Sequence, residues 1–542
     1  MESLSVKRLD HHGLVSGIVD ELKLVELIDS RLQADEQNEI SLGEAVKGMI
    51  LNGLGFSNRP LMLTPQFYTN LPVERLFRDG VKAEHFNRHK LGRTLDALSE
   101  YGCDMLFSEL AWSACQQEGV DVRHTSLDST SFSLTGQYPV DTDDEQAITL
   151  TYGHSKDHRP DLKQAVQEML VSQDGGIPLF CKSHDGNASD TVIFQERSKA
   201  LIDEFKKSTV PRNLIADSKL YNKKGAEFLK QLPFITRIPG TLAREQSLIQ
   251  ETLAAPECWQ EWAPGYRYHR VDHTHYAIKQ RWLVIYSDAA YQRADKTVGK
   301  AVEKERQRLD KAVFHLKAQR YGCQPDAERV LNELKKTTRY HALGEPEFIQ
   351  HKQYSGAGRP KKEADAKDTQ WQIIATFVRD DEHVESQRQQ KACFIIGTNV
   401  PESELDDWAV FQTYKNQSQV ERGFRFLKDP LFFVSSLFLK KASRIQALLM
   451  VMTLSLLVYS IAERRMRKQL AANNESLPNQ INIPTTTPTL RWVFQMLEGI
   501  NRVSLTLDGK QQWLIDGMTE LRIKIIRLFG EYVCRIYQIS CG

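Results

Sequence analysis

The chain has 542 residues, which exceeds the size of one hydrophobic core and favours three or four domains. Hydrophobic residues make up 41% of it and charged residues 26%, as in an ordinary soluble globular protein. The net charge of +1 neither supports nor excludes nucleic acid as a partner, because acidic and basic segments cancel.

The cysteines and apolar segments narrow the class of protein further. None of the eight cysteines forms a C-x-x-C pair, which argues against a zinc ribbon and suits a reducing cytoplasm. The N-terminal residues have no apolar core of the signal-peptide type. The longest apolar run, Ile445–Ala462, contains polar residues and is slightly shorter than a membrane-spanning helix. We therefore expect a buried core helix and no membrane partner.

Residues 1–118 have helical patterns. Apolar spacing predicts a helix over Leu14–Ile28, and Ser41 with Glu44 forms a capping box before a second helix. Two more helices are predicted on either side of Gly102, and the first of them begins with a basic cluster (Arg88, His89, Lys90 and Arg93). A helical pair with a basic end fits a DNA groove, while a plain helical domain that packs on the rest explains the pattern equally well.

From Val120 the pattern changes to strands. Alternating β-branched residues predict a strand that places Asp128 at or near its end. Two further strands, Ala147–Tyr152 and Gln164–Ser172, complete an antiparallel meander. Taken alone, Asp128 is also explained as a carboxylate that caps the following turn.

The loop between the second and third predicted strands is polar and basic. Lys156, Arg159 and Lys163 suit contact with a phosphate backbone. His154 and His158 have an H-x-x-x-H spacing, but the segment is interrupted by proline and lacks the glutamate of a zinc protease, so metal binding is the weaker alternative.

The next segment alternates helices with strands. A helix is predicted over Thr191–Lys206, a short buried strand ends at Asp217, and a helix and a strand follow up to Ile238. The order βββαβαβ places an acid at the end of the first and fourth strands. Carboxylates that end adjacent strands of a mixed sheet can meet.

From about 240 to 392 strands flank a long polar helix, Gln292–Arg320. This helix carries nine Lys or Arg against four acids, which suits contact with a DNA backbone and also a solvated surface helix. The segment Ser355–Lys362 is similar to an AT-hook, but such short matches are common and a flexible linker is the favoured interpretation.

The stretch Tyr414–Lys428 is predicted to be one helix that ends before Pro430. Polar residues at intervals of three, four or seven would share one face of it: Tyr414, Gln417, Glu421, Arg425 and Lys428. A surface helix with an ordinary Glu421–Arg425 pair fits this pattern, and so does one wall of a functional site.

Together these motifs resemble the DDE transposases of bacterial insertion sequences. Tyr414, Gln417, Glu421 and Lys428 match the spacing of the Y-x2-R-x3-E-x6-K signature of the insertion sequence four type, with glutamine in the arginine position. The segments L-D-S-T, G-H-S-K-D-H-R-P-D-L-K-Q and I-A-D-S-K-L-Y resemble those of the insertion sequence 1634 group. The resemblance covers roughly residues 120–465.

The resemblance implies an α/β fold with a ribonuclease-H-like catalytic domain that a mostly β insertion interrupts. The domains expected are a helical DNA-binding region (1–118), the catalytic domain in two parts (119–239 and 393–465), the insertion (240–392) and a C-terminal helical region (466–542). The gap from Asp217 to Glu421 is too long for a loop, and the insertion accounts for it.

The resemblance also implies the chemistry. Asp128, Asp217 and Glu421 would be the catalytic residues and would hold two Mg²⁺ ions, or Mn²⁺ in their place, because hard cations prefer carboxylate oxygens. DNA phosphates would be held by the polar face of the predicted helix and by the basic loop (Tyr414, Gln417, Arg425, Lys428, Lys156, Arg159 and Lys163).

We therefore expect a cytoplasmic, nucleoid-associated bacterial transposase. It would bind the terminal inverted repeats of its element as a homodimer, cleave the DNA and join the ends to target DNA. The alternatives are a ribonuclease-H-like nuclease without strand transfer and a catalytically silent DNA-binding derivative, for which Gln417 is the one supporting feature.

Overall fold

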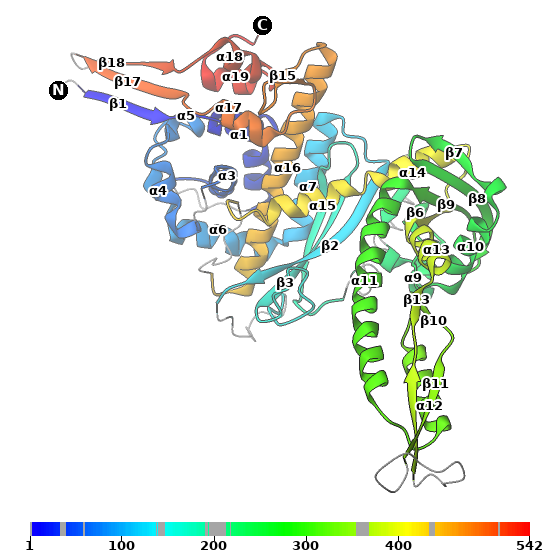
Figure 1. The fold of residues 1–542 in the computed structure, drawn as a ribbon. Helices are drawn as coiled ribbons and strands as arrows, with labels where there is room; N and C mark the ends of the chain where they lie inside the picture. The colour runs from blue at the N-terminus through cyan, green and yellow to red at the C-terminus, as the bar shows by residue number, and fades with distance from the viewer. Residues whose placement is uncertain are drawn as a thin grey trace, which may run out of the picture. The chain divides into compact units, whose positions relative to one another are not determined.

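The computed structural model describes residues 3–32, 39–57, 60–136, 138, 147–189, 193, 213–216, 218–353, 368–432, 439–507 and 510–541. These residues form two compact units, which are considered separately (Figure 1). The first unit comprises residues 1–236, 276–278 and 398–542, and the second comprises 237–275 and 279–397. Both units contain helices and strands, so the fold is mixed α/β.

The first unit opens with a strand and a group of helices. They are β1 (Ser3–Arg8), α1 (His12–Glu21), α2 (Leu24–Arg31), α3 (Leu42–Leu54), η1 (Leu61–Leu63), α4 (Thr64–Tyr68), α5 (Val73–Leu76), η2 (Ala83–Phe86), α6 (Arg88–Tyr101) and α7 (Cys103–Glu118). The capping box at Ser41 and Glu44 is confirmed. The predicted helix Leu14–Ile28 is divided at Lys23, which has a left-handed φ of 53°. Because β1 is a strand, the N-terminal region is not wholly helical.

Helix α16 (Ala442–Ala472) is the central element of the first unit. It packs against α3, α6, α7 and β4 (Pro178–His184) (Figure 1). By length and composition this 31-residue helix could cross a membrane, yet 89% of its most apolar window is buried inside the protein. The buried core helix predicted over Ile445–Ala462 is therefore confirmed.

The sheet of the first unit has the strand order β4-β3-β2-β5-β6. Its strands are β2 (His124–Leu134), β3 (Lys163–Ser172), β4, β5 (Asn213–Ala216) and β6 (Phe234–Arg237), with η3 (Ser218–Leu220) and α9 (Lys223–Leu229) between the last two. β2, β3 and β4 are antiparallel neighbours, whereas β2, β5 and β6 are parallel. The sheet is therefore mixed, as predicted.

One predicted strand of the meander is wrong. Residues Ala147–Tyr152 make a single bridge, between Thr151 and Gln164, and form no strand. Thr149 instead makes two hydrogen bonds with the turn after β4. Its N–H donates to Asp185 Oδ1, and its carbonyl accepts from Gly186 N. The third strand of the meander is β4, which the sequence analysis missed. The predicted helix Thr191–Lys206 lies outside the described residues except for Ile193.

The C-terminal region is not wholly helical either. Its elements are β15 (Leu477–Pro478), β16 (Pro484–Thr485), α17 (Leu490–Met496), β17 (Asn501–Leu507), β18 (Lys510–Asp516), α18 (Glu520–Arg527) and α19 (Glu531–Tyr537). The C-terminal helical region expected over 466–542 is wrong in part, because β17 and β18 form a hairpin that pairs with β1. The alternation V-S-L-T-L followed by D-G is typical of such a hairpin.

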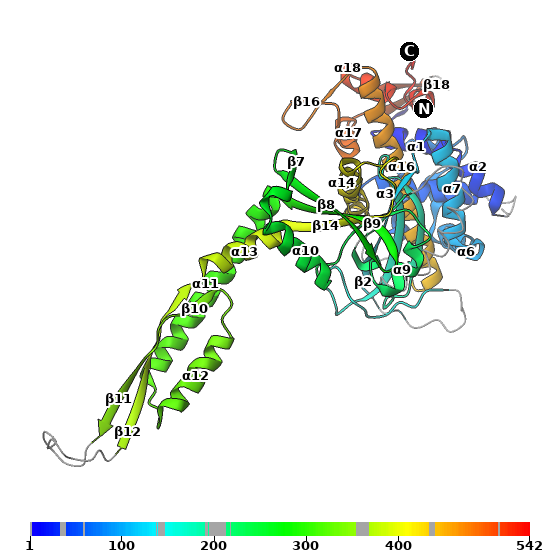
Figure 2. The same cartoon turned by 90° about the vertical axis from the view of Figure 1, so that its right-hand side faces the viewer.

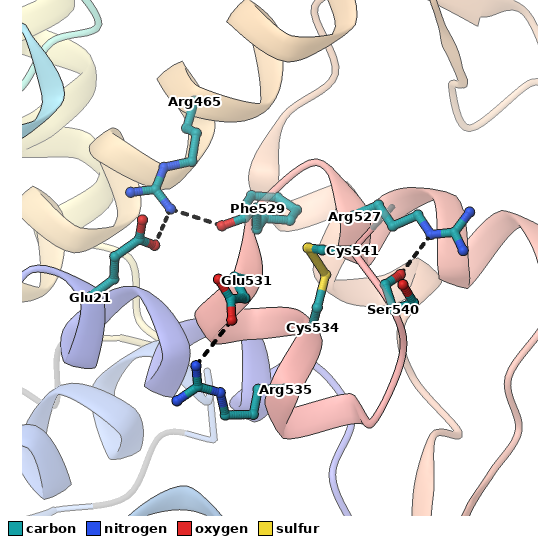
Figure 3. The surroundings of a disulfide bond; sticks show 9 residues. All are labelled: Glu21, Arg465, Arg527, Phe529, Glu531, Cys534, Arg535, Ser540 and Cys541. Atoms are coloured by element: carbon teal, nitrogen blue, oxygen red, sulfur yellow. Dashed lines mark hydrogen bonds and ion pairs between the residues drawn. A yellow bond between two sulfur atoms is a disulfide. The ribbon is translucent and has the colours of Figure 1, made fainter.

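A disulfide links α19 to the end of the chain. Cys534 and Cys541 are bonded with their Cα atoms 5.7 Å apart, a pair that the scattered cysteine spacing did not predict (Figure 3). Beside it, Arg465 of α16 donates to the Glu21 carboxylate and to the Phe529 carbonyl (Figure 3). The two ends of the chain are thus anchored to the same core helix.

The second unit contains a sheet with the strand order β14-β9-β8-β7 and two hairpin-like pairs, β10–β13 and β11–β12. Its elements are α10 (Ala243–Leu253), η4 (Pro256–Cys258), β7 (Gln260–Ala263), β8 (Tyr266–His275), β9 (Ile278–Ser287), α11 (Asp288–Ala318), α12 (Gln324–Lys336), β10 (His341–Leu343), β11 (Glu347–Gln353), β12 (Asp368–Ile374), β13 (Phe377–Arg379), α13 (Asp381–Ala392) and β14 (Cys393–Thr398).

The expectation of a mostly β insertion is wrong, because helices make up a large part of the second unit. The 31-residue α11 runs beside α13 and β12, and α12 packs on β12 (Figure 2). The predicted long polar helix is confirmed, because the buried residues of α11 are apolar and most of its charged residues are exposed. The segment Ser355–Lys362 lies outside the described residues.

Candidate active site

Strand β2 holds Asp128 at the point where its pairing with β5 ends. The last pair of this parallel ladder is Leu127 with Ala216, and Asp128 is the next residue of β2. β2 continues to Leu134, paired with β3. The prediction that Asp128 ends its strand is therefore wrong, but the residue does follow the end of the parallel ladder. Its side chain is 26% exposed.

Asp217 follows Ala216 directly in the sequence and lies outside the described residues. The strand before it is confirmed, because β5 is short and buried along its whole length. The parallel ladder pairs Ala216 with Leu127. Ala216 directly precedes Asp217, and Leu127 directly precedes Asp128.

Two helices replace the single helix predicted over Tyr414–Lys428. α14 (Asp407–Lys415) ends before Asn416, and α15 (Ser418–Leu427) begins after Gln417. Across the junction, N–H groups bond carbonyls three residues earlier instead of four. Asn and Ser side chains compete with the backbone for hydrogen bonds, which lowers their helix propensity and explains the break.

The break leaves Tyr414 and Gln417 outside α15, the helix that carries Glu421. Tyr414 is half-buried in the last turn of α14, and Gln417 is the half-buried residue that precedes α15. The prediction of one helix over Tyr414–Lys428 is therefore wrong, and the common face of Tyr414, Gln417 and Glu421 stays a prediction. Arg425 and Lys428 keep helical spacing to Glu421, with Lys428 at the C-terminal cap of α15.

Helix α15 lies on the sheet face toward which Asp128 points. Its buried residues include Gly423, where an added Cβ would lie 3.0 Å from Met169 Cε. Met169 is the β3 residue directly opposite Asp128 in the antiparallel ladder, and directly opposite residues have side chains on the same face. Gly423 thus lets the helix approach this face closely.

Lys428 provides a second contact of α15 with the same face. Its Nζ lies 5.6 Å from the centre of the Phe132 ring, and Phe132 is four residues after Asp128 on β2. Alternate residues of a strand share a face, so Phe132 and Asp128 point the same way. Since Gly423 is level with Asp128 and Lys428 with Phe132, α15 runs in the direction of β2. Glu421 is exposed on the side of α15 that carries Lys428.

The basic loop lies along β2. Lys156 Nζ is 4.0 Å from Asp128 Oδ1 and donates to the Ser129 carbonyl, while Lys156 N donates to Ser131 Oγ at 2.9 Å. The Asp157 carboxylate forms an ion pair with Lys428 Nζ at 2.7 Å. The loop therefore connects Asp128 to α15 through two lysines.

Two further basic residues predicted to bind DNA, Arg159 and Lys163, also have partners within the protein. The guanidinium of Arg159 donates to both carboxylate oxygens of Asp161, at 2.9 and 2.7 Å, on the surface of the loop. Lys163 is the first residue of β3, and its ammonium group donates to the Tyr138 carbonyl. Of the loop residues predicted to bind DNA, Lys156 is the one that the structure shows beside Asp128.

Two residues that position the site were missed by the sequence analysis. Asp157 pairs with Lys428, and its position next to Lys156 in the loop was a signal that could have found it. Gln173, in the turn after β3, donates to the Thr413 carbonyl of α14 at 2.7 Å and to Ser126 Oγ at 3.2 Å. A glutamine in a turn gives no comparable signal, because its partners are distant in sequence.

The donors at this site fit a hard divalent cation. Asp128 and Glu421 supply carboxylate oxygens, which Mg²⁺ prefers, and both are accessible to solvent. Within the described ranges, no group of three or more His, Cys, Asp or Glu side chains is arranged to hold a metal ion. Asp217 lies outside these ranges. His154 and His158 of the loop belong to no such group.

Comparison with known proteins identifies two families along the chain. A family model described as "Transposase DDE domain" matches residues 121–458, more than half of the chain. A domain of unknown function, DUF4277, matches residues 4–112. No curated protein matches the chain.

A solved structure titled "Cryo-EM structure of piggyBac transposase synaptic complex with hairpin DNA" is similar to this chain. Its TM-score is 0.34 and its sequence identity 8%, over 92% of this chain and 82% of that one. The family match carries the identification, because it spans the sheet with Asp128 and the helix with Glu421. The chain belongs to the transposase DDE domain family and is a DNA transposase, an enzyme of a family that generally uses divalent metal ions.

Proposed function

We propose that this transposase belongs to the insertion sequence 1634 group of the insertion sequence four type. It cleaves DNA at the terminal inverted repeats of its element and joins the ends to target DNA. Asp128, Asp217 and Glu421 are its metal ligands, in a ribonuclease-H-like domain that residues 240–392 interrupt. The observation that supports this most is the position of α15 on the same sheet face as Asp128.

The chain's own residues bind and position the DNA. Asp128, Asp217 and Glu421 would hold two Mg²⁺ ions, which would supply activation of the attacking hydroxyl and stabilisation of the leaving oxygen. Lys156 lies close enough to Asp128 to offset its charge and to contact a phosphate beside it. Lys428 pairs with a carboxylate of the loop, and a DNA phosphate can replace that anion as its partner.

The remaining DNA contacts are assigned to surfaces outside the acidic site. The basic cluster near the start of α6 and the positive excess on α11 suit binding to the backbone of the terminal repeats. The transposase acts as a homodimer on two element ends, in the bacterial cytoplasm at the nucleoid.

Glu421→Gln tests this function. The substitution keeps the size of the side chain and its place on α15 but removes the anionic oxygen, so we expect strand transfer of a pre-cut terminal-repeat end to fall at least about 100-fold. Binding of the same end, measured by gel shift, should change less than about twofold.

The matched control is Glu227→Gln, because Glu227 is 69% exposed on α9 and pairs with Lys230 at the surface. It should retain full strand transfer. Loss of joining in the control, or full joining in Glu421→Gln, contradicts the assignment. Wild-type cleavage without joining of a pre-cut end would instead favour a nuclease without strand transfer.

Gln417→Arg tests the position where the chain departs from the family signature. Gln417 lies next to the start of α15, so a guanidinium there adds one phosphate contact. We expect tighter DNA binding. We also expect the slope of the logarithm of the DNA association constant against the logarithm of salt concentration to become more negative by about one. Gln412→Arg, on the exposed side of α14, is the control and should leave the slope unchanged. An equal gain in both variants would show a nonspecific charge effect.

A further inference from the structure

Helix α11 of the second unit gathers basic residues on one of its faces. Residues at intervals of three, four or seven share a face of an α-helix. Five residues of α11 lie within an arc of about 80° on an ideal helix, and all five are exposed: Arg293, Lys296, Lys300, Lys304 and Lys311. These five residues are called the basic stripe. At 1.5 Å per residue, the stripe runs about 27 Å along the helix.

The buried residues of α11 lie on the side of the helix away from the basic stripe. They are all apolar: Ala294, Val298, Val302, Leu309 and Leu316. Their spacing of three, four or seven places them together on the opposite face. Because this face attaches α11 to the rest of the second unit, the basic stripe is directed toward solvent.

The four acids of α11 are paired with arginines that lie outside the basic stripe. Four ion pairs account for them: Glu303 with Arg306 at 2.8 Å, Asp310 with Arg306 at 2.8 Å, Glu305 with Arg308 at 3.7 Å, and Asp295 with Arg388 of α13 at 2.7 Å. Among the residues that the structure describes, none forms an ion pair with a side chain of the stripe. Positive charge on this helix is therefore compensated away from the stripe and uncompensated along it.

This separation of charges differs from that of an ordinary solvated helix. On a solvated surface helix, acids and bases alternate and pair with each other. In the stripe, Lys296, Lys300 and Lys304 follow one another at a spacing of one turn, at which like charges destabilise a helix. A polyanion bound along the stripe would neutralise these charges and remove their repulsion.

The geometry of α11 favours DNA over a membrane as the polyanion. A helix that lies on a membrane inserts an apolar face, and the apolar face of α11 is buried within its own unit. Lysine is a point charge on a flexible stem, which suits phosphates, and phosphate contacts carry no sequence information. B-DNA advances about 3.4 Å per base pair, so the stripe matches the length of about eight base pairs.

We propose that the basic stripe binds the phosphate backbone of about eight base pairs of duplex DNA, whatever their sequence. The choice of DNA as the polyanion rests on the proposed function. The stripe adds to that function a surface on the second unit that holds DNA without reading its bases. The recognition of terminal repeats then belongs to other residues of the chain.

Fluorescence anisotropy of the full-length protein with labelled random-sequence duplexes, in EDTA and over a range of salt concentrations, tests this surface. The test variant combines Lys296→Gln, Lys300→Gln and Lys304→Gln. Each phosphate contact contributes about −0.9 to the slope of the logarithm of the association constant against the logarithm of salt concentration. We therefore expect the slope to become less negative by about 2.7, and the affinity at about 0.15 M salt to fall about 100-fold. Duplexes of unrelated sequence should lose affinity equally.

Two control variants isolate the stripe from general charge and from folding. The first removes the same charge from exposed positions elsewhere in the second unit, by Lys279→Gln, Lys335→Gln and Lys391→Gln together. Its slope should stay within about 0.5 of the wild-type value. The second replaces the same three lysines of the stripe by arginine, which keeps the charge, and should bind like the wild type.

Three results would overturn the proposal. They are a wild-type slope in the glutamine variant of the stripe, an equal change in the glutamine control, and no duplex binding by the folded wild type. A loss confined to one duplex sequence would also contradict it, because that would indicate base readout.

The test is separate from the transposase reaction, because EDTA removes divalent ions and no bond is broken. Asp128→Asn should bind the random duplexes with the wild-type slope. Undiminished cleavage by Asp128→Asn would contradict the proposed active site and leave the stripe unaffected. A wild-type slope in the glutamine variant of the stripe would contradict the stripe and leave the active site unaffected.

Discussion

Asp128→Asn is expected to lower DNA cleavage and strand transfer at least about 1,000-fold, equivalent to about 4 kcal/mol of transition-state stabilisation. Asparagine has the size of aspartate and can still accept from Ser129 N, as Asp128 Oδ1 does at 2.7 Å. What it lacks is the negative charge that a hard divalent cation requires. The measurement is cleavage and joining of a labelled terminal-repeat substrate in Mg²⁺.

Asp381→Asn is the matched control for this variant. Asp381 is 80% exposed in the second unit and pairs with Arg379 at the surface. It should keep full activity, and both variants should bind the substrate and unfold like the wild type. Undiminished cleavage by Asp128→Asn would remove Asp128 from the active site.

Arg464→Met is expected to destabilise the first unit by about 3–5 kcal/mol, because it removes one partner of a buried ion pair. The Arg464 side chain is 5% exposed and donates to the Asp174 carboxylate. It also donates to the Glu118 and Gly119 carbonyls at 3.1 and 2.9 Å. Methionine fills much of the same volume but leaves all three acceptors without this donor.

This ion pair has a defined pH dependence. Burial raises the pKa of Asp174, but hydrogen bonds from Arg464 and from Asp121 N outweigh that effect and hold the pKa below its usual value of 3.8. Since the folded-state pKa is depressed, the stabilisation is present above the unfolded pKa and is lost as pH falls through the folded pKa. The difference between wild type and Arg464→Met should therefore be constant at neutral pH and shrink in acid.

Arg467→Met is the control for stability, because Arg467 is 32% exposed and pairs with Glu463 one helical turn away. Its cost should be below about 1 kcal/mol. Urea unfolding followed by far-ultraviolet circular dichroism measures both variants. Equal midpoints for the two would show that the Arg464 pair does not stabilise the unit.

Arg464 also bears on the active site through the turn between β3 and β4. Asp174 lies in that turn, beside Gln173, which bonds α14, and Gly176, where an added Cβ would lie 3.1 Å from Gln419 Oε1 of α15. Loosening the turn is therefore expected to disturb both helices. A fall in activity of Arg464→Met at temperatures where it remains folded would show this coupling.

Local patterns predicted the elements that local interactions determine. The capping box at Ser41 needs only residues of one helical turn, so it was predicted at the observed position. The strand before Asp217 was predicted for the same reason, because β5 is a buried apolar run.

Tertiary contacts decided the elements that were missed. Residues 147–152 alternate like a strand, but their backbone bonds the turn at Asp185 and Gly186. β17 has a strand pattern that pairing with β18 and with β1, almost 500 residues away, makes stable. The break at Asn416 follows from low helix propensity, which the spacing of the signature residues concealed.

The candidate site was predicted in its residue types but not in its arrangement. The order of Asp128 and Glu421 in the chain was available from the sequence, whereas the shared sheet face depends on Gly423 and Met169, which carry no chemical signal. The Lys156–Asp128 and Lys428–Asp157 pairs also join residues whose proximity only the fold creates.

Metal preference of cysteine variants is the most direct test of the central claim that Asp128 and Glu421 hold divalent ions together with Asp217. Strand transfer by Asp128→Cys and Glu421→Cys would be measured in Mg²⁺ and in Mn²⁺, which accepts the softer thiolate ligand better. We predict that both variants are inactive in Mg²⁺ and regain activity in Mn²⁺, while Asp381→Cys is active in both. Equal activity of the Asp128 and Glu421 variants in the two metals, at wild-type level, would contradict metal binding by these carboxylates.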